Sequence, residues 1–338
     1  MVRNCFAGAF LFLLTAILCL QFSPPAYSQA QRVNGRSKES DTSYTTWSAF
    51  VNTRKTHPGI QIVPELHSKE IAEKRNIVYK KAWGGRIYLG LDAFYPAGKS
   101  SVKRPAIVII HGGGWRSGNR TQHHPLAQHL ASLGYVCFTP EYMLSTLAPY
   151  PTAVYDLKTA LRWVVKHAGK FKIDTAKIAV LGFSAGGELA AFLGTTVGDP
   201  KFEGYKRPKE QPAPVHAVVD IDGTLSFTHP ESGEGDDSKK ISAATYWLGY
   251  AKKDSLALWD EASPLTHAGP HTPPTLFINS SVARMHAGRD DYIKILDQYK
   301  IYYEVKNFEN APHSFCLFDP WFQPTVTYID DFLKRVLK

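Results

Sequence analysis

The stretch that decides the fold is Ile178-Ala179-Val180-Leu181-Gly182-Phe183-Ser184-Ala185-Gly186-Gly187. An apolar run of strand character, 178–181, meets the pattern Gly-x-Ser-x-Gly, and small residues follow from 187 to 194. A strand, a sharp turn and a helix in this order expose the serine at the tip of the turn. The turn requires glycine at 182 and 186, because a Cβ at either position would clash with neighbouring backbone. We therefore predict Ser184 as a nucleophile, not as an incidental serine in a glycine-rich turn.

A second glycine motif follows another buried-strand pattern. Residues 106–110 are apolar and run into His-Gly-Gly-Gly-Trp at 111–115. Bare glycines let the backbone approach a ligand closely and direct N–H groups toward it. Such donors stabilise the oxyanion of a tetrahedral intermediate by several kcal/mol. We assign Gly113, Gly114 and Ala185 as these donors, and we expect His111 to brace the loop instead of transferring protons.

Further motifs accompany these two: Pro-Glu-Tyr at 140–142, the segment 151–163, and Pro312-His313. Together they resemble the α/β-hydrolase fold. Within it they are most similar to the acetyl and feruloyl esterases of plant polysaccharides, near the hormone-sensitive-lipase-like carboxylesterases. The resemblance covers residues 77–337 and is more specific for fold than for substrate. It implies a serine esterase that removes acetyl, feruloyl or methyl groups from a polymer such as pectin or xylan, without metal or cofactor.

The remaining elements fit an α/β protein. Strand and helix patterns alternate through the region of resemblance, which indicates a mostly parallel sheet covered by helices on both faces. Late strands are expected at Ala217–Ile221, Thr275–Asn279 and 302–308. Between the first two lies a long insertion, 224–264, the best candidate for a cap over the substrate. Its tryptophans, Trp247 and Trp259, either stack on sugar rings or pack a small core of the insertion.

His313 is the predicted general base. It follows the last strand of the pattern, the position from which a histidine reaches the serine in this fold. The resemblance also predicts an aspartate in the turn after Thr275–Asn279. The turn at 280–285 contains no carboxylate, so the third member of the triad has to come from elsewhere.

Two aspartates are the main replacements for the missing acid. Asp222 ends the strand before, and its ordinary role would be that of a turn residue. Asp290 begins a helix predicted over 290–299, and its ordinary role would be that of the helix N-cap. Asp291 or a glutamate of the insertion are further alternatives. We favour Asp222, because the end of a strand fixes a side chain more rigidly than a loop does.

A basic cluster follows the strand Thr275–Asn279. Arg284, His286 and Arg289 lie near the edge of the sheet where the active site is expected. Arginine pairs with carboxylates through two parallel hydrogen bonds, so these residues are predicted to bind the carboxylate of a galacturonate unit. The alternative is simple ion pairing with Asp290 and Asp291.

Residues 1–28 have the pattern of a signal peptide, with Arg3 near the start, an apolar core, and small residues before a cleavage site. The apolar stretch is short for a membrane span. We expect a periplasmic or secreted protein without stable membrane association after cleavage. Residues 29–76 form an N-terminal extension, and 77–338 form one catalytic domain.

Composition excludes other classes. The formal net charge of +9 reflects either ordinary surface lysine or attraction of an anionic polymer. Nucleic acid is a poor partner, because no binding motif accompanies the charge. A peptidase of the prolyl-oligopeptidase type usually carries a large extra domain, and a lipase an apolar lid. Neither pattern occurs, and the two cysteines beyond the leader, Cys137 and Cys316, are not a disulfide framework.

Overall fold

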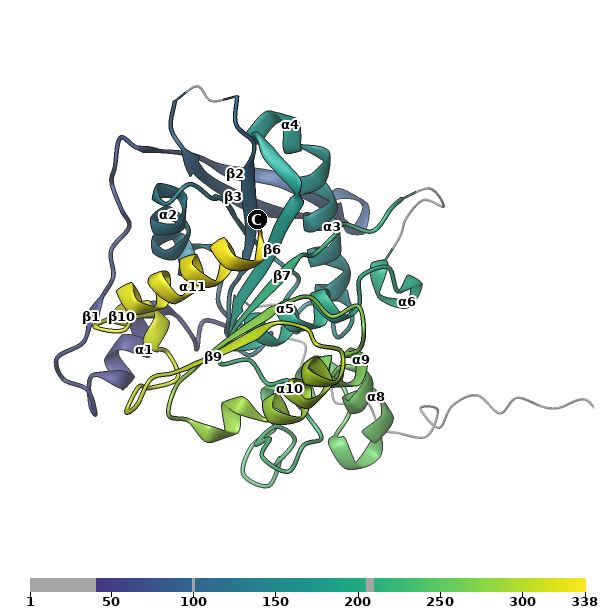
Figure 1. The fold of residues 1–338 in the computed structure, drawn as a ribbon. Helices are drawn as coiled ribbons and strands as arrows, with labels where there is room; N and C mark the ends of the chain where they lie inside the picture. The colour runs from purple at the N-terminus through teal and green to yellow at the C-terminus, as the bar shows by residue number, and fades with distance from the viewer. Residues whose placement is uncertain (1–40, 99–100, 205–209) are drawn as a thin grey trace, which may run out of the picture.

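An eight-stranded sheet forms the centre of the structure, a computed structural model that describes residues 41–98, 101–204 and 210–338. The strand order is β2-β3-β5-β4-β6-β7-β8-β9. Figure 1 shows this sheet and labels β2, β3, β6, β7 and β9 in it. Neighbours from β5 through β4 to β9 pair in parallel, whereas β2–β3 and β3–β5 pair antiparallel. The strands are β2 (Ile71–Ala82), β3 (Ile87–Pro96), β4 (Arg104–Ile110), β5 (Val136–Pro140), β6 (Ile173–Phe183), β7 (Ala217–Ile221), β8 (Thr275–Asn279) and β9 (Tyr303–Asn307). The predicted signal peptide lies outside the described residues.

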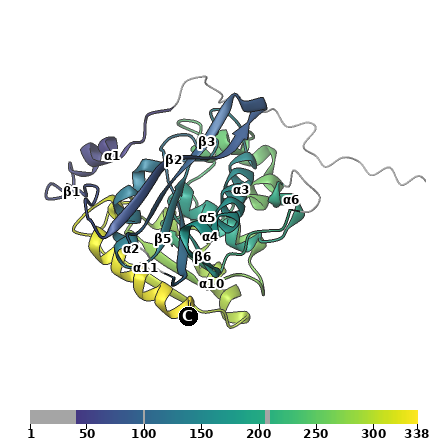
Figure 2. The ribbon, with the colours of Figure 1, turned by 90° about the horizontal axis from the view of Figure 1, so that it is seen from above.

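Helices cover both faces of this sheet (Figure 2). Successive strand residues point to opposite faces. Thus Ile107 and Ile109 of β4 pack with one set of helices and Val108 with the other. The first set is α2 (His124–Ser132) and α11 (Phe322–Val336); the second is α3 (Thr152–Lys166), α5 (Ala185–Thr195) and α10 (Arg289–Gln298). This is the mostly parallel, doubly covered sheet that the sequence predicts.

Shorter elements decorate the core. Helix α1 (Thr46–Thr53) and a small sheet of β1 (Gln61–Ile62) and β10 (Phe318–Asp319) join the N-terminal segment to the C-terminal region. Helix α4 (Ala168–Phe171) precedes β6, and helix α6 (Pro200–Glu203) follows α5. The insertion after β7 contains α7 (Ala243–Leu248), α8 (Leu256–Glu261) and α9 (Pro264–His267).

Element boundaries differ from expectation mainly at strand starts. β7 and β8 have the predicted bounds, but β2 begins at Ile71, before the region of resemblance, which starts at residue 77. The added residues are largely exposed and charged, so they show no apolar alternation, yet Ile71 pairs with Pro96 at the end of β3. Their strand conformation depends on the neighbouring strand, not on local preference.

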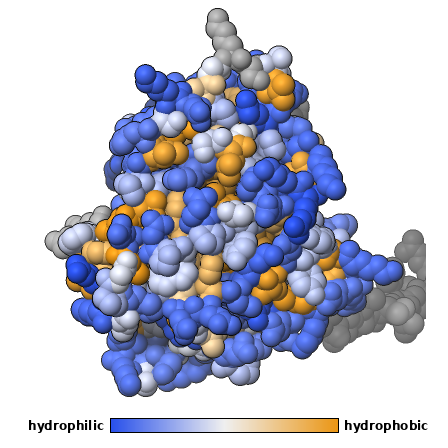
Figure 3. Space-filling model, turned by 60° about the vertical axis from the view of Figure 1, so that its left-hand side comes forward, coloured by the Kyte–Doolittle hydropathy of each residue, from blue (hydrophilic) through white to orange (hydrophobic). Residues whose placement is uncertain are grey.

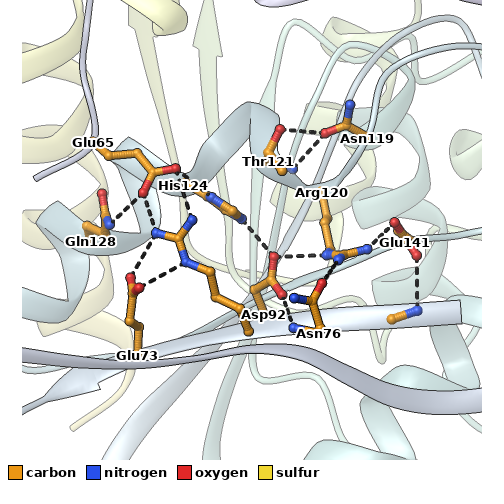
Figure 4. A network of polar contacts seen from close by, with 12 residues as sticks. Glu65, Glu73, Asn76, Asp92, Asn119, Arg120, Thr121, His124, Gln128 and Glu141 are labelled. Atoms are coloured by element: carbon orange, nitrogen blue, oxygen red, sulfur yellow. Dashed lines mark hydrogen bonds and ion pairs between the residues drawn. The ribbon is translucent and has the colours of Figure 1, made fainter.

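A polar network ties the N-terminal segment to the sheet and to α2 (Figure 4). The buried His124 lies between two carboxylates, with Nδ1 2.9 Å from Glu65 and Nε2 2.9 Å from Asp92. Arg120 donates to Asp92 and also reaches Asn76 and a glutamate after β5. Because buried charges need partners, this network fixes residue 65 against β3.

The surface shown in Figure 3 has apolar side chains in small patches separated by polar ones. Within the described ranges, no helix is both long enough and apolar enough to cross a bilayer. Cys137 and Cys316 are buried free thiols.

Candidate active site

Ser184 sits at the tip of a strained turn between β6 and α5. Its φ of 57° and ψ of −123° are sparsely populated for a residue with a side chain. The turn closes tightly: a Cβ on Gly182 would lie 1.8 Å from the Gly186 carbonyl oxygen, and one on Gly186 would lie 2.2 Å from the Ile110 carbonyl oxygen. Both glycines are therefore required sterically. The Ser184 N–H donates to the carbonyl of Ile221, which anchors the turn to β7.

The glycine loop after β4 brings its backbone beside the serine. Gly114 and Ala185 line the same cavity as Ser184. Gly113 does not line it; its φ of 124° and missing Cβ let Ser117 approach, and its carbonyl accepts from the Ser117 N–H. The structure therefore places two of the three predicted oxyanion donors at the cavity, and Gly113 in the turn of the loop.

His111 has the bracing position expected of it. It is buried, stacks on Tyr142 at a centroid distance of 4.3 Å, and has Nδ1 2.9 Å from the Gly112 carbonyl. Burial lowers the pKa of His111 to about 4, against a weaker opposing effect of the Gly112 bond. The neutral ring therefore donates from Nδ1 to the Gly112 carbonyl and fixes the loop.

Trp115 locks the glycine loop to the insertion. Its Nε1–H donates to the buried Glu188 Oε2 at 2.9 Å, and its ring stacks on Trp247 at 4.7 Å. Burial raises the pKa of Glu188 well above its ordinary value, against the weaker effect of the hydrogen bond from Trp115. Trp247 and Trp259 are fully buried. Of the two predicted roles, they therefore have the structural one: they pack a small core and do not present their faces to a sugar.

Ser184, His313 and Asp222 form a continuous hydrogen-bonded chain. His313 Nε2 lies 2.8 Å from Ser184 Oγ, and His313 Nδ1 lies 2.9 Å from Asp222 Oδ2. His313 comes from the loop after β9, and Asp222 from the end of β7. With Nδ1–H donated to the carboxylate, Nε2 is free to accept the serine proton.

Asp222 is fully buried and has a strained backbone with φ of 51°. Burial alone would raise its pKa. The contacts with the side chains of His286, His313 and Ser280 outweigh burial and lower the pKa of Asp222 to about 2. The Ser280 N–H also donates to Oδ1 at 2.8 Å. The carboxylate is therefore ionised at neutral pH and fixed in one orientation.

Asp290 and Asp291 both have other partners and lie away from this chain. The Asp290 side chain is 74% exposed and pairs with Arg289 at 2.9 Å. Asp290 is not the N-cap of α10 either: the helix begins at Arg289, after Gly288 in the left-handed conformation. Asp291 pairs with Lys294 at 2.7 Å. The expected capping role was wrong because glycine in this conformation directs the chain into the helix one residue earlier.

Of the basic cluster, only Arg284 reaches the cavity. His286 turns toward the acid, with Nε2 3.5 Å from Asp222 Oδ1. Arg289 donates to Asn279 at 2.8 Å and pairs with Asp290. The prediction of one shared carboxylate subsite was therefore wrong for two residues, because the turn before α10 points them in different directions.

The cavity beside Ser184 has a volume of about 90 Å³. Its lining includes four residues that the sequence did not single out for the site, Trp115, Thr224, Glu234 and Met285, besides those already described. Glu234 comes from the insertion, where no periodicity or motif marks it. The described residues contain no group of three His, Cys, Asp or Glu side chains arranged to hold a metal ion.

Comparison with known proteins identifies the family of this chain and several relatives. The BD-FAE family model matches residues 91–285. The protein named "Probable carboxylic ester hydrolase LipM" of Mycobacterium tuberculosis is 30% identical over 61% of this chain and 49% of its own length. Esterase LipC of the same organism is 30% identical over 56% of this chain and 47% of its own length.

Solved structures share the fold. The propionate-bound esterase Est2 of Thermogutta terrifontis matches with a TM-score of 0.62 and 26% identity, covering 79% of this chain and 95% of its own. A truncated carbohydrate esterase from gut microbiota matches with a TM-score of 0.64 at 20% identity, covering 80% of this chain and 100% of its own. The architecture is thus that of the α/β-hydrolase esterases, and the chain belongs to the BD-FAE family. It spans about half the length of the curated relatives it matches.

Proposed function

We propose that the protein is a serine carboxylesterase that removes acetyl or similarly small acyl groups from carbohydrate esters such as those of xylan or pectin. The observation that carries the proposal is the hydrogen-bonded chain from Ser184 through His313 to Asp222 at a small cavity. Relatives named as carboxylic ester hydrolases support the reaction class. A neighbour named as a carbohydrate esterase supports the substrate class.

The mechanism is acyl transfer in two steps. His313 Nε2 takes the Ser184 proton as Oγ attacks the ester carbonyl, and the oxyanion receives hydrogen bonds from the N–H groups of Gly114 and Ala185. Asp222 stabilises the imidazolium. The C–O bond to the alcohol then breaks, and His313 returns the proton to the leaving oxygen. Water, deprotonated by the same histidine, releases the acid and restores the serine.

The size of the cavity favours a small acyl group. About 90 Å³ is far below the 300 Å³ or more of sites for drug-sized ligands, so an aromatic feruloyl group fits poorly. The Thermogutta esterase was solved with propionate and with butyrate bound. A feruloyl esterase and a general short-chain carboxylesterase are the competing specificities. The pattern of residues 1–28 supports export to the periplasm or the medium, where such polymers are found.

The test is a panel of esters assayed with wild type and Ser184→Ala. Hydrolysis of p-nitrophenyl acetate should exceed that of the octanoate and of methyl ferulate, and acetate should be released from acetylated xylan or pectin. Ser184→Ala should remain folded and lose activity by several orders of magnitude, because the covalent step is removed. Retained activity in this variant would overturn the proposal. A preference for methyl ferulate would select the feruloyl alternative.

A further inference from the structure

The cavity has a buried side and an exposed side. Trp115, Ala185 and Met285 are buried, whereas Arg284 is exposed and Glu234 is half-buried. An acyl group small enough for the cavity occupies the buried side. The alcohol of a polymeric ester has to extend into solvent, so it passes the exposed side, where two side chains of opposite charge lie.

Glu234 is held in place by the insertion. Its Oε2 accepts from the Ala244 N–H at 3.2 Å, in the first turn of α7. Its backbone carbonyl accepts from Lys252 Nζ at 2.7 Å, and the next N–H, of Gly235, donates to Ser242 at 3.1 Å. A carboxylate fixed from both main chain and side chain loses little freedom when it binds a ligand.

Both charged groups retain unused hydrogen-bonding capacity. Within the described part of the chain, the side chain of Glu234 is bonded through Oε2 and not through Oε1, and the guanidinium of Arg284 has no hydrogen bond or ion pair. The stem of Arg284 packs beside the insertion, since a Cβ on Gly233 would lie 3.3 Å from its Cδ. The cavity therefore offers an acceptor and a donor fork together. Hydroxyl groups, which donate and accept at once, match this pair.

We propose that Glu234 and Arg284 form a subsite for the free hydroxyls of a neutral sugar ring beside the ester. The proposal rests on the esterase function above and specifies the alcohol side of the substrate. Glu234 accepts a hydrogen bond from one hydroxyl, and Arg284 donates to its neighbour. A uronate carboxylate gains from the arginine but is repelled by the glutamate, so the pair favours neutral sugars over galacturonate.

The experiment compares two esters that differ only in a hydroxyl, the monoacetate of vicinal trans-cyclohexanediol and cyclohexyl acetate. Wild type should prefer the hydroxylated ester about tenfold in kcat/KM, the size expected for a hydrogen bond to a charged group. Glu234→Ala should abolish the preference, and Glu234→Gln should retain part of it because the amide oxygen still accepts. The matched control is Glu231→Ala in the same insertion. The side chain of Glu231 is 57% exposed, and this variant should retain the full preference for the hydroxylated ester.

A second arm uses acetylated oligosaccharides of xylose and of galacturonic acid. Glu234→Gln should lower kcat/KM on the neutral sugar and raise it on the anionic one. Three outcomes overturn the subsite. One is an equal loss of kcat/KM on both cyclohexyl esters in Glu234→Ala, and another is a fall of kcat/KM on the galacturonate ester in Glu234→Gln. The third is a preference for the hydroxylated ester that is unchanged in Glu234→Gln. These results leave the esterase function standing. Absence of wild-type activity on every ester overturns that function, and the subsite with it.

Discussion

Replacement of Asp222 by Asn tests the assignment of the triad acid. The side chains have the same shape, so the buried site accepts the amide without a cavity. The N–H of Ser280 donates to Oδ1 at 2.8 Å and needs an acceptor, so the amide oxygen stays at that position. The amide nitrogen then faces His313 Nδ1, where Asp222 Oδ2 lies at 2.9 Å in the native protein. Nδ2–H therefore donates to Nδ1 and moves the ring proton to Nε2.

A ring with its proton on Nε2 cannot accept the proton of Ser184. The imidazolium also loses the charge that stabilises it. By analogy with the same change in other serine triads we expect kcat to fall roughly a thousandfold to ten-thousandfold, or about 4 to 5.5 kcal/mol in the barrier. The unfolding transition should remain cooperative, since volume and the Ser280 bond are preserved.

The assay is steady-state hydrolysis of p-nitrophenyl acetate by purified variants, with circular dichroism to show that each is folded. Asp290→Asn is the matched control, because Asp290 is exposed and pairs only with Arg289 among the described contacts. We expect its kcat to stay within about twofold of wild type, and its stability within about 0.5 kcal/mol. An Asp222→Asn variant that keeps more than a tenth of wild-type kcat, or an Asp290→Asn variant that loses the larger factor, would refute the assignment.

Three further changes test the surroundings of the site. His286→Asn removes an imidazole 3.5 Å from Asp222. The kcat for p-nitrophenyl acetate should therefore fall about tenfold with KM unchanged. An unchanged kcat would show that His286 does not position the acid. Trp247→Ala should lower the free energy of unfolding in urea by about 3 to 5 kcal/mol, because a fully buried ring stacked on Trp115 is lost. The third change concerns Glu65. Burial raises the pKa of this carboxyl, but its bonds to Arg75 and His124 outweigh burial and hold the pKa at about 2, below its ordinary 4.5. The ionised Glu65 therefore stabilises the folded protein above about pH 4.5, and this stabilisation is lost as the pH falls toward 2. In Glu65→Gln, the free energy of unfolding in urea should decline less between about pH 7 and pH 3 than in wild type.

Local signals made the centre of the site predictable. The turn around Ser184 excludes side chains at 182 and 186 through backbone clashes within a few residues, so the pattern appears directly in the sequence. His313 was found from its place after the last strand, because strand order and parallel pairing fix which loops meet. Both inferences depend on contacts that the chain order itself determines.

The remaining parts depended on side-chain directions that no pattern encodes. Arg284, His286 and Arg289 are close in sequence, but the turn before α10 sends them to the cavity, to the acid and to Asn279 respectively. Glu234 lies in an insertion without periodicity. It reaches the cavity from a segment whose main chain is hydrogen-bonded to the side chains of Ser242 and Lys252.

The position of Asp222 explains how the triad can dispense with an acid after β8. β7 and β8 are neighbours and parallel, with Ile221 opposite Ile278, so both chains leave the sheet at the same edge. Asp222 is the first residue beyond β7, and its left-handed backbone turns the carboxylate sideways, where Oδ1 accepts from the N–H of Ser280, the first residue beyond β8. The carboxylate thus occupies the turn in which the resemblance predicted an aspartate, although it is supplied by the adjacent strand. An imidazole requires a charge at a point in space and not at a position in sequence, and the end of either strand can deliver it there.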